Sequence, residues 1–227
     1  MDRIPTGIPG FDKLIQGGFL PGSVVMLTGS TGTGKTIFGC QFLWTGLSKN
    51  EPCMYITLEE PPEDIRTDAM QFGWDFSKYE KKGLLKLEYI DPVKLGSAAI
   101  DVGEMVKRHG TKRLVLDSVT ILGLAIREPS QIRRRIYNFI RSVKLAGCTS
   151  LLISEIPEGS PTLSKFGVEE YVVDGVVVMQ YWSIASENFG IIEVRKLRRT
   201  SHAKGYYPTF ITKNGLKIGS EQITPIK

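Results

Sequence analysis

Short runs of apolar residues alternate along the chain with longer stretches in which apolar residues recur every three or four positions. The apolar runs predict buried strands near residues 24–28, 54–58, 85–90, 113–117 and 149–154. The periodic stretches between them predict helices near residues 34–48, 62–72, 97–109 and 129–145. This alternation is typical of an α/β fold, in which a mainly parallel sheet is covered by helices on both faces.

The pattern changes after residue 174, where only strands are expected. Strand-like segments lie at 175–179, 191–195, 210–212 and 216–218, and a turn at 213–215 joins the last two. Strands that follow one another without intervening helices pair antiparallel through short connections. We therefore expect an antiparallel C-terminal extension at one edge of the sheet.

Residues 29–36 read Gly-Ser-Thr-Gly-Thr-Gly-Lys-Thr and lie between an apolar run and a helical pattern. Glycines let the backbone curl so that successive N–H groups point inward at phosphate oxygens. Lys35 can reach the terminal phosphates, and the Thr36 hydroxyl can coordinate Mg²⁺. A chance Gly- and Thr-rich turn is the alternative, but the flanking strand and helix favour a phosphate-binding loop. The chain is therefore expected to bind a nucleoside triphosphate.

Carboxylates follow two of the predicted strands. The run 113–117 ends in Asp117, where such proteins present an acid to the water shell of Mg²⁺. The run 54–58 is followed by Glu59 and Glu60. This pair could be a solvated entry to the next helix. Beside a phosphate loop we favour a catalytic role, because a water that attacks the terminal phosphate needs a base or an orienting group.

Length, cysteines and the lengths of the apolar runs limit the class of protein. The chain has 227 residues, and we expect residues 1–227 to form a single domain with a full core. Cys40, Cys53 and Cys148 have neither close pairing nor metal-ligand spacing, which favours buried reduced thiols. The start resembles no signal peptide, and no run of about eighteen apolar residues occurs, so we expect a cytoplasmic protein without membrane contact.

The net charge is +5, and the basic residues are clustered. Clusters of this kind indicate an anionic partner. For Arg133–Arg135 a solvated helix surface is the better interpretation, because isoleucines mark one face of the helix 129–145 and adjacent arginines fall outside it. A second cluster lies within residues 195–204.

Several short segments occur in the order seen in one ATPase family. Besides the phosphate loop and the glutamate pair, they are Thr6–Asp12 with Gly17–Gly18, Phe72–Asp75, Phe166–Tyr171 and Lys196–His202. On these motifs almost the whole chain resembles the KaiC domains of the RecA superfamily. Those domains are the ATPase modules of the cyanobacterial clock protein and of single-domain archaeal relatives. The resemblance implies a RecA-like P-loop NTPase fold.

The resemblance also implies roles for residues at the nucleotide. ATP contacts are implied along the phosphate loop, at Ser30, Thr31, Gly32, Thr33, Gly34, Lys35, Thr36 and Ile37. Asp117 is implied to hold Mg²⁺ together with Thr36. Glu59 and Glu60 match the family's catalytic glutamates, and Lys35 is expected to stabilise the transferring phosphate.

Family members form hexameric rings with ATP between subunits, which implies a homo-oligomer. The segment that reaches a neighbour's nucleotide is matched by Lys196, Leu197, Arg198, Thr200 and His202. Lys196 and Arg198 lie two apart on an expected strand, so both would project to one face and could act on a neighbour's phosphates. A basic edge strand that only resists aggregation is the alternative. Thr212 matches a further nucleotide-contacting threonine, although Lys213 stands where the clock protein has an acid.

Three functions are compatible with these residues. We favour an ATP-hydrolysing homo-oligomer, expected to be a hexamer, that acts as a switch or assembly factor. Self-phosphorylation is not expected, because Glu169 and Glu170 replace the Ser and Thr of the family's autophosphorylating domains.

The two alternatives are less favoured. A RecA/RadA-type paralogue in DNA repair would contact DNA near residues 118–128 and 156–166, but Leu122–Ile126 is apolar and the second segment offers only Lys165 as a basic residue. A non-hydrolysing ATP-binding signalling module is disfavoured because Glu59 and Glu60 are both present.

Overall fold

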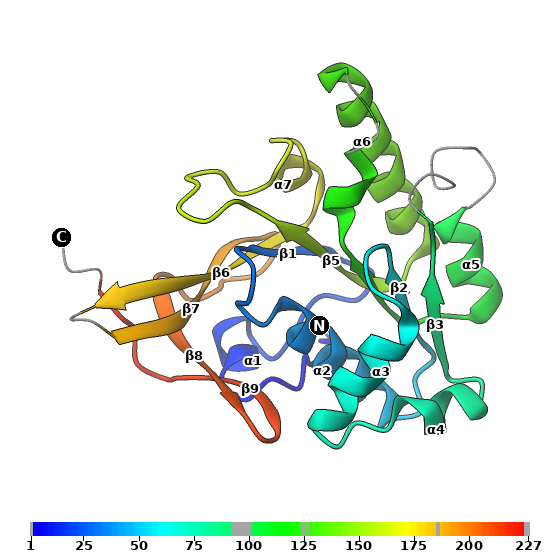
Figure 1. The fold of residues 1–227 in the computed structure, drawn as a ribbon, viewed down its shortest axis with the longest axis horizontal. Coiled ribbons are helices and arrows are strands. Elements are labelled where there is room, and N and C mark those ends of the chain that lie inside the picture. Colours follow the sequence, from blue (N-terminus) through cyan, green and yellow to red (C-terminus); the bar gives the residue numbers. More distant parts are fainter. Residues whose placement is uncertain (1, 92–100, 124–125, 127, 185–186, 225–227) are drawn as a thin grey trace.

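The computed structural model describes residues 2–91, 101–123, 126, 128–184 and 187–224. Its strands form one sheet in the order β3-β2-β4-β5-β1-β6-β7-β8-β9 (Figure 1). The strands are β1 (Val24–Gly29), β2 (Cys53–Thr57), β3 (Leu85–Tyr89), β4 (Arg113–Asp117), β5 (Thr149–Glu155), β6 (Gly175–Ile184), β7 (Glu187–Leu197), β8 (Tyr206–Thr212) and β9 (Gly215–Ile218). Neighbours from β3 to β6 pair in parallel, and those from β6 to β9 pair antiparallel. The predicted α/β fold with an antiparallel C-terminal extension is confirmed.

Helices cover both faces of the sheet. The α-helices are α1 (Phe11–Leu14), α2 (Lys35–Leu47), α3 (Pro62–Gln71), α4 (Phe76–Lys81), α5 (Val102–His109), α6 (Pro129–Ala146) and α7 (Glu169–Val172). One core cluster joins the sheet to α1, α2, α3 and α4. A second cluster joins its other face to α5, α6, α7 and the 3-10 helix Val119–Gly123 (Figure 1).

The central strands are buried on both faces. Every residue of β1 and of β2 is buried, which explains why both read as continuous apolar runs rather than alternating ones. The carboxyl ends of these strands lie side by side at one end of the sheet. Gly29 of β1 lies beside Glu155 of β5, and Thr57 of β2 lies beside Asp117 of β4. Parallel register therefore gathers residues that are far apart in the sequence.

Several elements differ from the sequence predictions. β6 and β7 are longer than the expected 175–179 and 191–195, because the apolar pattern marks only the part of this hairpin that packs on the core. The short helices α1, α4 and α7 were not predicted, since four to six residues carry too little periodicity. The start of the helix expected over 97–109 lies outside the described residues, and the described helix begins at Val102.

The three cysteines, Cys40, Cys53 and Cys148, are buried and have free thiols. Burial raises the pKa of all three thiols. Within the described ranges, none of the helices combines the length and the apolar character needed to cross a bilayer.

Candidate functional site

The phosphate loop connects the end of β1 to the start of α2, as its sequence context predicts. Gly32 and Gly34 have φ angles of 81° and 91°, which glycine adopts without steric cost. At Gly29 a Cβ atom would lie 2.0 Å from the carbonyl oxygen of Met179, so glycine is needed where β1 and β6 meet. The loop thus turns the first N–H groups of α2 toward the open end of the sheet, where a helix attracts anions.

Lys35 is held inside this loop. Its Nζ donates to the carbonyl oxygen of Ser30 at 2.8 Å and lies 3.7 Å from Glu155 Oε1. The side chain is only 6% exposed. Burial lowers the pKa of Lys35, while the negative charges of Glu155, Asp117 and Glu59 oppose that shift. The lysine is therefore a cation surrounded by acids at the end of the sheet.

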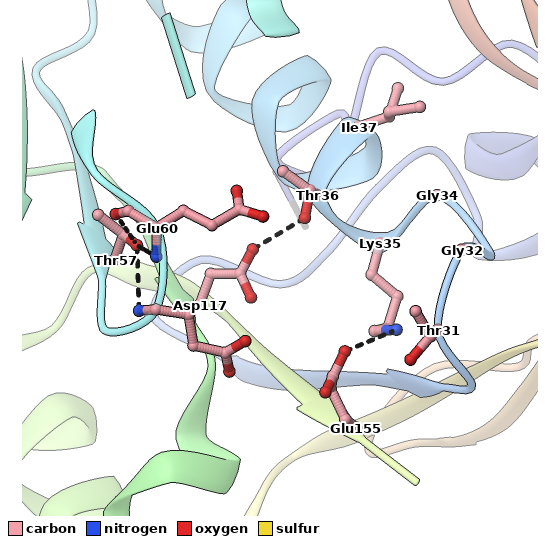
Figure 2. Close-up of a pocket in the computed structure, with 11 residues that line it drawn as sticks. Thr31, Gly32, Gly34, Lys35, Thr36, Ile37, Thr57, Glu60, Asp117 and Glu155 are labelled. Carbon is pink, nitrogen blue, oxygen red and sulfur yellow. Dashed lines mark hydrogen bonds and ion pairs between the residues drawn. The ribbon is translucent and has the colours of Figure 1, made fainter. Parts of the chain in front are cut away.

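Glu155 was not anticipated as a site residue. It ends β5, just as Asp117 ends β4, so the same sequence signal, an apolar strand that ends in a carboxylate, could have identified it. Figure 2 shows its side chain directed at Lys35.

Thr36 and Asp117 meet as their predicted roles require. Thr36 Oγ1 donates to Asp117 Oδ2 at 3.0 Å, and the Tyr55 hydroxyl donates to the same oxygen at 2.7 Å. Burial raises the pKa of Asp117, and these two hydrogen bonds oppose that shift. Tyr55 was missed by sequence reasoning because it lies inside the buried strand β2, where an aromatic residue is expected to serve packing alone.

The glutamate pair leaves β2 through a turn shaped by Thr57. The Thr57 hydroxyl accepts hydrogen bonds from the N–H groups of Glu59 and Glu60 and donates to the Glu60 carbonyl oxygen. Ser118 Oγ donates to Glu59 Oε1, which ties the glutamate to the end of β4. In Figure 2 the carboxylates of Glu60 and Asp117 point into the same space beside Thr36.

These side chains border one pocket at the open end of the sheet. It is lined by Thr31, Gly32, Gly34, Lys35, Thr36, Ile37, Thr57, Glu59, Glu60, Asp117 and Glu155. Burial is the main cause that raises the pKa of Glu60, and the charge of Asp117 is the next. The pocket thus concentrates carboxylates around the buried Lys35.

The donor set fits Mg²⁺. This ion prefers hard oxygen ligands and is usually held by one or two protein groups, with waters and substrate phosphates completing its octahedron. The Thr36 hydroxyl and the Asp117 carboxylate supply such oxygens side by side. Among the described residues no group of three or more His, Cys, Asp or Glu is arranged to hold a metal.

The basic segment 196–202 begins at the opposite end of the strands from the phosphate loop. Gly175 and Val176, at the start of β6, pair with Leu197 and Lys196, whereas the phosphate loop begins beside Met179, farther along the same strand. Four residues of a strand span about 13 Å. The structure therefore does not bring this segment to the chain's own phosphate loop.

The expectation that Lys196 and Arg198 share a strand face needs correction. β7 ends at Leu197, and Arg198 follows it, before Arg199 turns the backbone with a φ of 57°. The alternation of side chains along a strand therefore does not determine the direction in which the Arg198 side chain points. Both side chains nevertheless meet the α7 region, since Lys196 Nζ donates to the carbonyl oxygens of Glu170 and Val173, and Arg198 Nη2 donates to that of Tyr171.

The remaining predicted residues occupy two separate places. Thr200 Oγ1 accepts a hydrogen bond from Arg3, and His202 contacts the Ala203 carbonyl oxygen, both in the segment that follows the end of β7. Thr212 ends β8 and donates to the Gly215 carbonyl oxygen. The β8–β9 hairpin packs beside Gly34, because a Cβ there would lie 3.5 Å from a methyl group of Leu216. Thr212 is therefore on the phosphate-loop side.

The fold and the loop geometry define a P-loop ATPase fold of the RecA type, and comparisons with known proteins narrow this class. The family model described as "ATPase: KaiC" matches residues 4–223. The chain is 34% identical over 240 residues to a UPF0273 protein of Methanopyrus kandleri, covering 98% of this chain and 94% of that relative. The chain belongs to the KaiC family.

Two further relatives agree with this assignment. The circadian clock oscillator protein KaiC of Synechococcus elongatus is 33% identical over 227 residues, and the match covers 95% of this chain but only 44% of the clock protein. The crystal structure of a KaiC-like protein from Pyrococcus horikoshii superposes with a TM-score of 0.86 at 37% identity, covering 96% of this chain and 99% of the other.

Proposed function

We propose that this protein binds ATP with Mg²⁺ and hydrolyses it to ADP and phosphate. The observation that carries the proposal is the convergence of a buried lysine, a threonine–aspartate pair and two glutamates on one pocket. Phosphoryl transfer needs chiefly positioning and charge stabilisation, and these groups supply both. Membership of an ATPase family supports the same reaction.

Different groups of the pocket bind the phosphates and the metal ion. The N–H groups of the phosphate loop bind the phosphate oxygens, and Lys35 leaves the Ser30 carbonyl oxygen and Glu155 to meet the terminal phosphates. Thr36 and Asp117 would hold Mg²⁺. When bound, this ion neutralises charge on the β- and γ-phosphate oxygens.

A glutamate accepts the proton of the attacking water. We assign this role to Glu59, because Ser118 fixes its carboxylate at the edge of the pocket. Glu60 is the alternative, and its position beside Asp117 and Thr36 also suits a group that orients water near the metal. Substitution of each glutamate separates the two assignments.

We further propose that the chain works as a homo-oligomeric ring in which sites are shared between neighbours and turnover serves a switch or assembly role. The supporting observation is the distance between the basic segment and the chain's own phosphate loop. Lys196 and Arg198 lie at the end of the strands opposite the phosphate loop, so they reach a nucleotide only if it belongs to another subunit. Thr200 and His202 follow Arg198 in the same segment and would complete the contact.

Particle mass and phosphate release, measured together, test the proposal. With ATP and Mg²⁺ the protein should form a particle of several subunits and release phosphate, and Lys35→Ala should do neither. Turnover by a particle with the mass of one chain would contradict shared sites. Assembly without turnover would leave an ATP-binding module in place of an ATPase.

A further inference from the structure

Glu155 forms an ion pair with the ammonium group that is expected to meet the terminal phosphates. Its Oε1 lies 3.7 Å from Lys35 Nζ, and the Glu155 side chain is 40% exposed whereas that of Lys35 is buried. Among the acids that oppose the lowering of the Lys35 pKa by burial, Glu155 has the largest effect, ahead of Asp117 and Glu59. Asp117 and Glu59 have tasks in the proposed reaction, whereas Glu155 has none.

The backbone holds Glu155 in this place from both sides. The Glu155 N–H group donates to Thr120 Oγ1 at 2.8 Å, which ties the end of β5 to the 3-10 helix that follows β4. The N–H group of the next residue, Ile156, donates to the carbonyl oxygen of Gly29, where the phosphate loop begins. The carboxylate can therefore turn about its side-chain bonds, but the α-carbon of Glu155 stays beside the phosphate loop.

A terminal phosphate and Glu155 compete for one cation. Lys35 Nζ has three N–H donors, and one of them bonds to the Ser30 carbonyl oxygen. A phosphate oxygen that accepts from Nζ lies about 2.8 Å from it, so this oxygen and Glu155 Oε1 would be no more than about 6.5 Å apart. That separation is shorter than the Debye length of about 8 Å at physiological salt, so the two negative charges repel each other without full screening.

The strength of this repulsion depends on the number of phosphates in the nucleotide. The γ-phosphate of ATP adds negative charge at the end of the chain of phosphates that Lys35 reaches, whereas ADP ends at the β-phosphate. Asp117 lies beside Thr36, where Mg²⁺ would offset its charge, but Glu155 lies on the side of Lys35 (Figure 2). Within the described ranges Lys35 is the only cation that forms an ion pair with Glu155. A γ-phosphate that takes up Lys35 therefore leaves the Glu155 charge poorly compensated.

We propose that Glu155 sets the preference of the pocket between ATP and ADP, because its charge repels the γ-phosphate and so weakens ATP binding relative to ADP binding. This inference rests on the proposed function, since it concerns the same nucleotide site. ADP then remains an effective competitor, and occupancy of the site by ATP depends on the ratio of ATP to ADP rather than on ATP alone. Such a dependence suits the switch role proposed above.

Removal of the Glu155 charge tests this preference. The probes are ADP and a non-hydrolysable ATP analogue in which an NH group bridges the β- and γ-phosphorus atoms. Glu155→Gln keeps the shape of the side chain and should tighten binding of the analogue about tenfold more than binding of ADP. Glu155→Asp keeps the charge, so the ratio of the two affinities should stay within about threefold of the natural ratio. Glu158→Gln removes an exposed acid outside this pocket and is the matched control.

Calorimetry with Mg²⁺ and each nucleotide gives the two dissociation constants, and a thermal melt checks that each variant is folded. If Glu155→Gln changes both affinities equally or neither, in a protein whose natural form binds ATP, the inference is overturned and the proposed function stands. Weaker binding of the analogue by Glu155→Gln would also overturn it, because the acid would then help to hold the nucleotide. So would the same gain in Glu158→Gln, which would trace the effect to net charge. Failure of the natural protein to bind either nucleotide would instead reject the proposed function.

Discussion

The hydroxyl of Thr36 donates a 3.0 Å hydrogen bond to Asp117, although the two residues are 81 positions apart in the chain. The bond joins the first turn of α2 to the end of β4, and Tyr55 holds the same carboxylate oxygen from β2. Three elements therefore fix the geometry of the oxygens expected to hold Mg²⁺. Such prior arrangement reduces the cost of ordering the site when substrate binds.

Lys35→Ala should abolish ATP binding, because the lysine is the point charge that meets the terminal phosphates. Isothermal titration calorimetry with Mg²⁺ and ATP measures the affinity. Lys49→Ala, an exposed lysine just after α2, is the control and should bind as the natural protein does. Unchanged affinity in Lys35→Ala would contradict the phosphate-loop assignment.

Glu59→Gln should retain ATP binding and lower phosphate release by about a hundredfold or more, because the amide keeps the shape and loses the base. Glu60→Gln is the matched variant and should cost less. A larger loss in Glu60→Gln would reverse the assignment within the pair. If both variants release phosphate at the natural rate, the pair has no catalytic role.

Much of the site could be predicted from the sequence, because strand ends in a parallel sheet meet at one edge. Lys35 and Thr36 follow one apolar run and Asp117 ends another. If these two runs are parallel strands, the three residues must lie close together. Glu155 obeys the same rule and was overlooked. Tyr55 could not be found in this way, since its hydrogen bond depends on the side-chain geometry across two strands.

The surroundings of the basic segment 196–202 were harder to predict. The prediction that Lys196 and Arg198 project to one face assumed a strand through both residues, but β7 ends between them. What determines their surroundings is the packing of α7, a four-residue helix without a periodic signal, whose carbonyl oxygens they contact. Local turns of this kind depend on tertiary contacts that a single sequence does not display.

Tyr55→Phe should shift the acid side of the pH profile of ATP turnover to higher pH. Burial raises the pKa of Asp117, and the hydrogen bond from Tyr55 is the largest of the effects that lower this pKa. Removing that bond raises the pKa further, so the carboxylate that would hold Mg²⁺ protonates at a higher pH. The comparison is kcat/KM against pH at fixed Mg²⁺. Tyr79→Phe, which changes a tyrosine that packs against Trp44, should leave the profile in place.

Arg198→Ala should leave the subunit folded and lower ATP turnover by about a thousandfold, because a cation supplied across an interface stabilises charge on the transferring phosphoryl group. A mixing experiment separates action in trans from action in cis. Inactive Arg198→Ala subunits combined with inactive Glu59→Gln subunits should recover part of the activity, since some interfaces then pair an intact glutamate with an intact arginine from the neighbour.

An arginine that acts within its own subunit gives a different result. Every site in the mixture would then lack one of the two groups, and activity would not return. Subunit exchange must therefore be demonstrated in parallel, by mixing chains that carry different fluorophores and measuring energy transfer. The position of Arg198 beside the start of β6, at the other end from the phosphate loop, predicts recovery. Exchange without recovery would leave Arg198 as a structural cation that holds the Tyr171 carbonyl oxygen.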